Sequence, residues 1–400
     1  MWTAIIAGIL LFMFLVVVHE FGHFIAAKKS GVKVLEFGIG IPPKAFTFYK
    51  DKDGTEYTIN WLPLGGFVRL KGENPDDTET FHAKDSFITQ NLFKKVLILV
   101  GGVAVNLLFA WLFFTAAFWK GIEPISIVPE SMLSIDPESY MMPTQDFLDR
   151  QGLLSGDVQH GPIKVQQVLP DSIAEDVGIM SGTVITSISG QEVDTSNLQS
   201  VLRENIGKEI QIGFEKDGQK YEEKAECQYD RCLLGIAMKQ YSDIEVLPMQ
   251  FGLWGGMAAG AHEIKAQTRL TFHVLGNIFS QLITFEREKA RDAVENLAGP
   301  VGAVKVGEII LDEFGFWQYL AFGGMISLAL AIFNALPIPA LDGGRLVGAI
   351  IQSVGKLKPE KYFVVEGYMN LLFFVLLMSL GIYIIFLDLA RFWGVNPFGM

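Results

Sequence analysis

Four long apolar stretches constrain this chain more than any other feature of its sequence. They cover residues 2–27, 96–119, 314–341 and 367–387, and the last three contain no charged residue. A helix of about 20 apolar residues crosses the hydrocarbon core of a bilayer. The sequence therefore predicts a polytopic α-helical membrane protein with about four transmembrane helices. The first stretch lacks the basic start and the small-residue cleavage site of a signal peptide, so we expect it to be retained.

The composition excludes two broad classes of protein. Half of the 400 residues are apolar and 19% are charged, against about 25% charged in an average soluble protein. Such a chain is too hydrophobic to be a disordered polyelectrolyte. Its net charge of −12 is the opposite of the basic surface that nucleic-acid binding requires. We therefore expect no nucleic-acid partner, and a lipid bilayer around the apolar stretches.

The distribution of charge orients the predicted helices. Residues 27–95 hold 11 Lys or Arg, and the connection 342–366 holds four. Residues 120–313 instead hold 30 acidic and 16 basic residues, a balance of −14. Because short cytosolic connections are enriched in Lys and Arg, we expect the first and third connections to be cytosolic. Both termini and residues 120–313 then lie on the outer side.

The predicted spans divide the chain into membrane, cytosolic and outer segments. In chain order we expect a first transmembrane segment (1–27), a cytosolic loop with a β-hairpin (28–95), a second transmembrane segment (96–119), an extracytosolic linker (120–159), a small α/β domain (160–245), an amphipathic helical region (246–313), a third transmembrane segment (314–341), a second cytosolic loop (342–366), a fourth transmembrane segment (367–390) and a tail (391–400).

Local patterns refine three of these segments. Alternating residues around Asp53-Gly54 predict the cytosolic hairpin. In the small domain we expect strands near 163–169 and 184–189, short helices near 172–177 and 196–205, and a hairpin turning at Asp217-Gly218. The amphipathic residues 247–291 either lie on the outer surface or pack on the membrane core, and their pattern leaves both possibilities open.

The sequence His19-Glu20-Phe21-Gly22-His23 at the end of the first span is an HExxH motif. Residues four apart share one face of a helix, so both imidazoles can reach one zinc ion. Glu20 is then placed to take a proton from the attacking water. Ionisable residues in a membrane helix are costly and are functional by default. The alternative is a polar cluster at the cytosolic margin of the helix, capped by Lys28 and Lys29.

A catalytic zinc ion needs a third protein ligand, and Asp342 is the strongest candidate. Of the other histidines, His82 lies in the predicted cytosolic loop and the remaining three lie outside. Asp342 follows Pro337 and Pro339, which cannot continue a regular helix. Irregular backbone at membrane depth is tolerated only inside protein or beside a wet cavity. The alternative is a helix that simply ends at Pro337, with Asp342 capping the next turn.

Three motifs together resemble the site-2 protease family, of the bacterial type known as regulator-of-sigma-E protease. They are HEFGHFIAAKKSGVKVLEFGIG at 19–40, GTEYTINWLPLGGFVRLKGE at 54–73 and NALPIPALDGGR at 334–345. The resemblance covers nearly the whole chain. It implies one Zn²⁺ per chain, with His19, His23 and Asp342 as ligands and Glu20 as general base.

The same resemblance implies how a substrate is held. A re-entrant β-hairpin near 61–70 would present an edge, at Gly65 and Gly66, to an extended substrate. Asn334 resembles an asparagine that contacts the substrate backbone or the transition state, and Pro337 belongs to the same substrate-binding segment. The small outer domain would be a single PDZ domain, which either recognises a new C-terminus or only excludes bulky ectodomains.

The function implied is that of an intramembrane zinc metalloprotease of the bacterial inner membrane. It would hydrolyse peptide bonds in or near transmembrane segments of single-span proteins such as anti-sigma factors or signal-peptide remnants. Its active site would lie near the cytosolic side, and its PDZ domain would be extracytosolic. The competing hypothesis is a non-proteolytic membrane PDZ adaptor or chaperone with a degenerate metal site. Cys227 and Cys232, both in the outer domain, form either a disulfide or two buried thiols.

Overall fold

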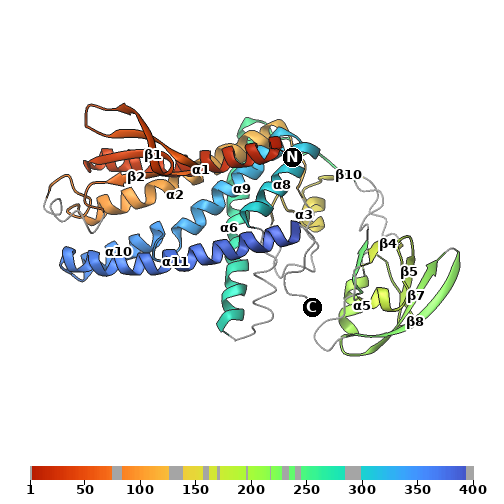
Figure 1. Cartoon of the computed structure of the whole chain (residues 1–400). Coiled ribbons are helices and arrows are strands. Elements are labelled where there is room, and N and C mark those ends of the chain that lie inside the picture. Colours follow the sequence, from red (N-terminus) through yellow and green to blue (C-terminus); the bar gives the residue numbers. More distant parts are fainter. Residues whose placement is uncertain are drawn as a thin grey trace. The chain divides into compact units, whose positions relative to one another are not determined.

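The computed structural model describes residues 2–73, 83–125, 138–155, 162–168, 172–194, 197–216, 218–227, 234–238, 245–283 and 299–392 (Figure 1). The chain forms two compact units. One contains Met1–Ser126, Pro137–Pro143 and Met249–Met400, and the other contains Ile127–Asp136 and Thr144–Pro248.

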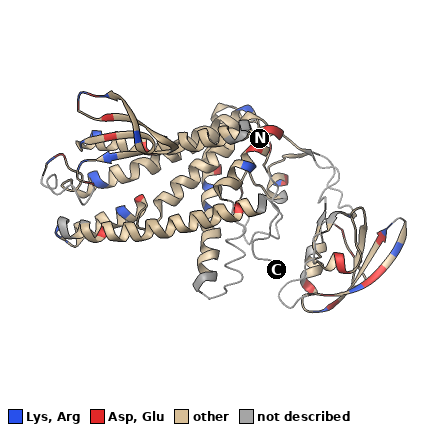
Figure 2. Ribbon diagram, in the orientation of Figure 1, with Lys and Arg blue, Asp and Glu red and all other residues tan. Residues whose placement is uncertain are grey.

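The first unit is built on the apolar helices α1 (Trp2–Ser30), α2 (Leu92–Lys120), α9 (Phe316–Ala335) and α11 (Pro359–Phe392). Among the described residues, four helical segments are long and apolar enough to cross a membrane: Ile6–Ser30, Leu92–Lys120, Phe316–Ala335 and Val364–Ala390. The prediction of four spans is therefore confirmed at the level of helix length and composition. In Figure 2 these helices are tan over most of their length, whereas charged residues mark the β-hairpin and the helix ends.

The third span is shorter than its apolar stretch. We predicted it over 314–341, but α9 ends at Ala335, because Pro337 and Pro339 prevent the helix from continuing. A new helix, α10 (Asp342–Val354), begins at Asp342. The segment 342–366 is therefore largely helical, with α10 followed by the start of α11.

The predicted hairpin is formed by β1 (Val34–Lys50) and β2 (Glu56–Leu70), and both strands bend. Residues 36–39 pair with 66–69 on one side and with 56–59 on the other, while 44–50 pair with the outer side of 56–60. The segment 66–70 is therefore an edge of this sheet. Near the bend, large apolar side chains such as Phe46, Phe48 and Trp61 are exposed.

The amphipathic region contains α6 (Leu253–Ile283) and α8 (Pro300–Glu313). Figure 1 shows α6 running across α2 rather than alongside it. Trp111 Nε1 of α2 donates a hydrogen bond to the carbonyl of Met257, at 3.0 Å, so the first half of α6 packs on the membrane core. Phe272 and Phe279 in its second half are exposed.

A buried carboxylate on α6 holds the segment that precedes the second unit. Glu263 is 0% exposed. It accepts hydrogen bonds from Ser139 Oγ at 2.6 Å, from the Tyr140 backbone N–H at 2.7 Å and from Gln267 Nε2 at 2.9 Å. Burial raises the pKa of the Glu263 carboxyl. Three donors on one buried acceptor make this a fixed anchor between α6 and residues 139–140.

The second unit contains a mixed α/β module. Its elements are α3 (Gln145–Arg150), β3 (Leu154–Ser155), β4 (Ile163–Val168), α4 (Ile173–Asp176), β5 (Val184–Ile188), β6 (Gln191–Glu192), α5 (Leu198–Glu204), β7 (Glu209–Lys216), β8 (Gln219–Glu226), β9 (Ile236–Met238) and β10 (Glu245–Val246). The main sheet has the order β8-β7-β5-β4-β9, with β6 beside β5. Its core is formed by apolar side chains such as Ile163, Ile185 and Ile212.

The elements predicted for residues 160–245 occur close to their expected limits, although Asp217 of the expected turn lies outside the described residues. The predicted linker 120–159 is not wholly separate from this module. β3 pairs with β10, so that Ser155 lies opposite Glu245 at the entrance and exit of the module. Cys227 is buried and belongs to a disulfide, whereas Cys232 lies outside the described residues.

We expect Glu263→Ala to lower the free energy of unfolding by about 3 kcal/mol, because it removes a buried acceptor that receives three hydrogen bonds. Lys265→Ala removes an exposed charge from the same helix and should change the stability by less than about 0.5 kcal/mol. Thermal unfolding of the two purified variants in detergent measures the difference. Equal melting temperatures would show that the Glu263 anchor contributes nothing.

Candidate metal centre

His19 and His23 lie one turn apart on α1, where the HExxH spacing places both rings on one face. They are 6% and 9% exposed, and the two Nε2 atoms lie 3.1 Å apart. The apolar residues around the motif favour a long continuous helix. Two buried imidazoles therefore point at the same place near the C-terminal end of the predicted span.

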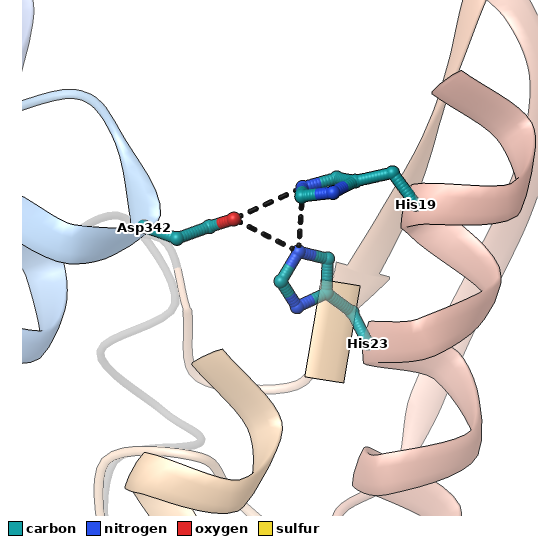
Figure 3. Close-up of side chains that lie close together, drawn as sticks. All are labelled: His19, His23 and Asp342. Carbon is teal, nitrogen blue, oxygen red and sulfur yellow. Dashed lines mark hydrogen bonds and ion pairs between the residues drawn. The ribbon is translucent and has the colours of Figure 1, made fainter. Parts of the chain in front are cut away.

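Asp342 joins the two histidines from the other end of the chain. Its Oδ2 lies 3.0 Å from His19 Nε2 and 3.2 Å from His23 Nε2. Figure 3 shows the three side chains converging from α1 and from the start of α10. Among the residues that the structure describes, these three form the group of His, Cys, Asp or Glu side chains that could hold a metal ion.

The donor set and its dimensions fit a zinc ion. Zinc binds imidazole nitrogen and carboxylate oxygen at about 2.0–2.2 Å, so tetrahedral ligands lie about 3.3 Å apart. The triangle of 3.0, 3.1 and 3.2 Å between the ligand atoms is close to this value. Three protein ligands leave one tetrahedral position open, as a catalytic site requires.

The close approach of α2 to α1 seats both rings. A methyl group at Gly22 would clash with the backbone of Gly101, so the two helices meet backbone to backbone. A methyl group at Gly102 would lie 2.5 Å from His23 Nε2 and 2.7 Å from His19 Cε1. Only a glycine at position 102 leaves room for both imidazoles in this position.

The outer nitrogens of both rings also meet α2. Nδ1 of His23 donates a hydrogen bond to the carbonyl of Ile98 at 2.8 Å. Nδ1 of His19 lies 3.3 Å from the side-chain amide nitrogen of Asn106. Such partners of the second ring nitrogen orient a metal-binding histidine and select its tautomer. α2 therefore positions the two histidines of α1.

Asp342 is positioned by the irregular segment between α9 and α10. Ala340 has a φ of 75°, a conformation that costs an L-residue roughly 1–2 kcal/mol. Its N–H donates to Oδ1 of Asn370 on α11 at 2.9 Å. Side chains at Gly343 or Gly344 would clash with carbonyls of residues 335–338. The two glycines therefore allow the first turn of α10 to pack directly on the backbone of the segment that precedes it.

An ion pair connects the start of α10 to the end of the hairpin. Arg345 Nη1 lies 2.6 Å from Glu73 Oε1, and Glu73 Oε2 accepts a hydrogen bond from the Leu70 N–H at 3.1 Å. The Arg345 guanidinium also lies 5.7 Å from the ring centre of Phe87. Arg345 is three residues from Asp342, so this contact fixes the helical turn that holds the third candidate ligand.

Glu20 faces the free edge of the hairpin. Its Oε2 accepts a hydrogen bond from the backbone N–H of Val68 at 3.0 Å. Since 36–39 occupy the other side of the 66–69 segment, the N–H of Val68 points away from the sheet. The edge of β2 is thus directed at the motif on α1. Next to it, Gly65 and Gly66 pack against Val16 and Val17 of α1.

Two cavities adjoin the three candidate ligands, and Glu20 and Asp342 line both. One, of about 270 Å³, is also lined by Val16, Leu330 and Asn334. The other, of about 210 Å³, is lined by residues that include Phe67, Val68, Glu73 and Arg345.

The structure brings together His19, Glu20, His23, Asn334 and Asp342. Gly65 and Gly66 lie beside α1 just before the motif, and Pro337 lies in the segment that precedes Asp342.

Sequence reasoning missed the contacts of Asn106, Asn370, Arg345 and the Val68 N–H. The two asparagines had a usable signal, because each is a polar residue inside an apolar stretch. The Val68 contact had none, since a backbone N–H leaves no mark on the sequence.

The amino-acid sequence was compared with models of protein families and with known proteins. The model of Peptidase family M50 matches residues 7–380. A zinc metalloprotease RasP of Oceanobacillus iheyensis is 29% identical over 441 residues, which cover 97% of this chain and 99% of the relative. A probable protease eep of Enterococcus faecalis is 27% identical, with 97% of this chain and 99% of the relative covered. A regulator of sigma E protease of Haemophilus influenzae is 24% identical, with 94% and 96% covered.

We expect Gly102→Ala to weaken zinc binding at least about 100-fold, because its methyl group displaces both imidazoles. Gly276→Ala, in α6, is the matched control, since a methyl group there meets no neighbouring atom. Zinc content after dialysis against a graded series of chelator concentrations gives the affinity of each variant. A folded Gly102→Ala protein with wild-type affinity would contradict this account of the site.

Proposed function

Because the chain belongs to peptidase family M50 and is a zinc metalloprotease of the site-2 protease type, we propose that it cleaves single-span membrane proteins at or near their transmembrane segments. The observation that supports this best is the triangle of His19, His23 and Asp342, in which the two histidines are buried near the end of an apolar helix. A degenerate metal site in a non-proteolytic adaptor would have no reason to keep these three donors within 3.2 Å of one another.

In this proposal, one zinc ion per chain is held by Nε2 of His19, Nε2 of His23 and a carboxylate oxygen of Asp342. Bound zinc supplies a Lewis acid for the scissile carbonyl and for the attacking water. The protein contributes the fixed directions of the donors. α2 contacts the two imidazole rings on the side away from the proposed metal. The ion pair of Arg345 with Glu73 and the hydrogen bond from Ala340 to Asn370 hold the segment around Asp342.

Glu20 is the general base in this mechanism. It accepts the proton of the attacking water and passes it to the leaving amine, a role suited to a carboxylate next to the first ligand. The Val68 N–H fixes one oxygen of Glu20 at 3.0 Å and leaves the other free for water. Both cavities reach Glu20, so water and a peptide can approach the same carboxylate.

The edge of β2 binds the substrate in extended form. A peptide bond in a transmembrane helix is protected by the hydrogen bonds of that helix, so the substrate has to unwind before cleavage. The Gly66 end of this edge offers replacement hydrogen bonds, as in other cases of strand addition, whereas the N–H groups of Val68 and Leu70 already donate to Glu20 and Glu73. Groups of alternate residues face the same edge of a strand, so Gly66 faces the same way as Val68.

Asn334 and Pro337 complete the substrate side of the site. Asn334 lines the cavity next to His19 and Glu20, where its amide can donate to the developing oxyanion or to the substrate backbone. Pro337 ends α9 near this cavity and keeps the following backbone irregular. The apolar lining by Val16 and Leu330 suits the side chains of a former transmembrane helix.

We place the chain in a bacterial inner membrane, with the metal centre near the cytosolic side. The positive charge of the first and third connections supports this orientation. The second unit, including the PDZ-like module at 160–245, then lies outside. The name of the Haemophilus influenzae relative supports anti-sigma factors as one substrate group, with signal-peptide remnants as another.

We expect Glu20→Gln to retain zinc at wild-type stoichiometry and to lower cleavage by about 10²–10⁴-fold, the usual contribution of a general base. The assay uses purified full-length protein and a single-span model substrate in detergent, with zinc measured on the same samples. Glu209→Gln, an exposed carboxylate of β7, is the control and should cleave normally. Wild-type cleavage by Glu20→Gln would refute the proposed mechanism.

The outer module is proposed to act as a filter against substrates with bulky ectodomains. Because Ser155 lies opposite Glu245 in a β-pair, residues 156–244 can be replaced by a short Gly/Ser turn without separating the flanking strands. The shortened protein should cleave a substrate with an intact ectodomain almost as fast as a trimmed one, whereas the full chain prefers the trimmed form. An unchanged preference after deletion would reject the filter.

A further inference from the structure

We propose that Asn106 of α2 is a positioning residue that keeps the proton of His19 on Nδ1, so that Nε2 is free to bind zinc. This inference rests on the zinc ligands proposed above and adds a residue that acts through His19 rather than by binding the metal. It predicts a defined chemical requirement at position 106, which is a hydrogen-bond acceptor aimed at His19.

The side chain of Asn106 is confined beside the ring of His19. Asn106 is 0% exposed, and its amide nitrogen lies 3.3 Å from His19 Nδ1. Its Oδ1 is buried and has no hydrogen-bond partner among the described residues. An unpartnered buried acceptor is costly, so this oxygen is an unexplained polar group at the edge of the metal centre.

The chemistry of imidazole shows which amide atom His19 needs. A neutral ring has one N–H, and a ring that binds a metal through Nε2 has its proton on Nδ1. Nδ1 is then a donor and requires an acceptor. The oxygen and nitrogen of an amide exchange places by a half-turn, so Oδ1 of Asn106 can occupy the position next to Nδ1. That arrangement gives Oδ1 a hydrogen bond and moves the amide N–H₂ away from His19, its present partner.

The second histidine has the same arrangement in a simpler form. Nδ1 of His23 faces the carbonyl of Ile98 at 2.8 Å, and a carbonyl can only accept. Ile98 and Asn106 are both on α2, about two helical turns apart. One helix thus offers an acceptor to each ring. At Ile98 the acceptor is a backbone carbonyl, which mutation does not remove. At Asn106 the acceptor is a side-chain oxygen, so a mutation can remove it.

The backbone of Asn106 is fixed independently of its side chain. Ser327 Oγ of α9 donates a hydrogen bond to the Asn106 carbonyl at 2.9 Å. A purely structural role for position 106 would depend on this contact between α2 and α9. The proposed role depends only on the side-chain amide of Asn106. Substitution of Ser327 therefore tests the structural role, and substitution of Asn106 tests the proposed one.

The test compares zinc affinity of full-length Asn106→Leu, Asn106→Asp and Ser327→Ala proteins in detergent, measured by competition with a chelator. Asn106→Leu removes the acceptor and should bind zinc about 10–100-fold more weakly, the usual effect of losing such a partner. Asn106→Asp keeps an acceptor at the same position and should bind zinc within about threefold of wild type or more tightly. Ser327→Ala should bind zinc as wild type does.

A spectroscopic measurement accompanies the affinities. Cobalt replaces zinc in the same proteins, and its visible absorption reports the ligand geometry. The spectrum of Asn106→Asp should match that of wild type, whereas Asn106→Leu should show a weakened or shifted spectrum. Melting temperatures of all variants identify any that fail to fold.

Two results would overturn the inference: a folded Asn106→Leu protein with wild-type zinc affinity, or an Asn106→Asp protein that loses zinc as severely as Asn106→Leu. His19→Ala distinguishes this failure from failure of the proposed ligand set. If His19→Ala loses zinc while Asn106→Leu keeps it, only the role of Asn106 is wrong. If His19→Ala keeps zinc, the ligand set itself is wrong.

Discussion

The contact between α1 and α2 is the interaction on which the rest of the site depends. Two imidazoles in an apolar environment need a partner for every ring nitrogen, because unpaired polar groups are costly there. α2 meets the outer nitrogens through Ile98 and Asn106, and Asp342 meets the inner ones. α2 reaches the rings only because Gly22 and Gly101 let the two backbones touch. The small residues that pack these helices are therefore also a condition for the chemistry.

The third proposed ligand, Asp342, is held in a different way from the two histidines. His19 and His23 lie within a continuous helix, whereas Asp342 follows a non-helical segment and lies 323 positions from His19. The left-handed conformation of Ala340 is one that persists only when its surroundings impose it. Here the surroundings are Asn370 on α11 and the pair of Arg345 with Glu73. The complete donor set thus forms only when the hairpin, α10 and α11 are all in place.

Much of the fold and part of the site could be predicted from sequence, because their signals are local. Apolar length predicted the four spans, and helical spacing predicted that His19 and His23 share a face. Asp342 was predicted as a ligand from its setting after two prolines that interrupt the helix, and α9 does end just before them, at Ala335. The contact of Glu20 with Val68 is between a side chain and a backbone N–H on a strand whose bend creates its free edge. Such contacts depend on tertiary pairing, which no single segment encodes.

Two cavities surround Glu20, the proposed general base. The first is lined by Val16 and Leu330 together with the polar side chains of Asn106 and Asn334, whereas the second is lined by Phe67 and Val68 together with the ion pair of Glu73 and Arg345. Each lining combines apolar and polar side chains, so each cavity is compatible with an unwound transmembrane segment and with water. Since Glu20 lines both cavities, the carboxylate lies where an apolar peptide and a polar nucleophile can meet. Hydrolysis inside a membrane requires that water and the peptide reach the same carboxylate. In this chain the contact between the edge of β2 and α1 places Glu20 where both can do so.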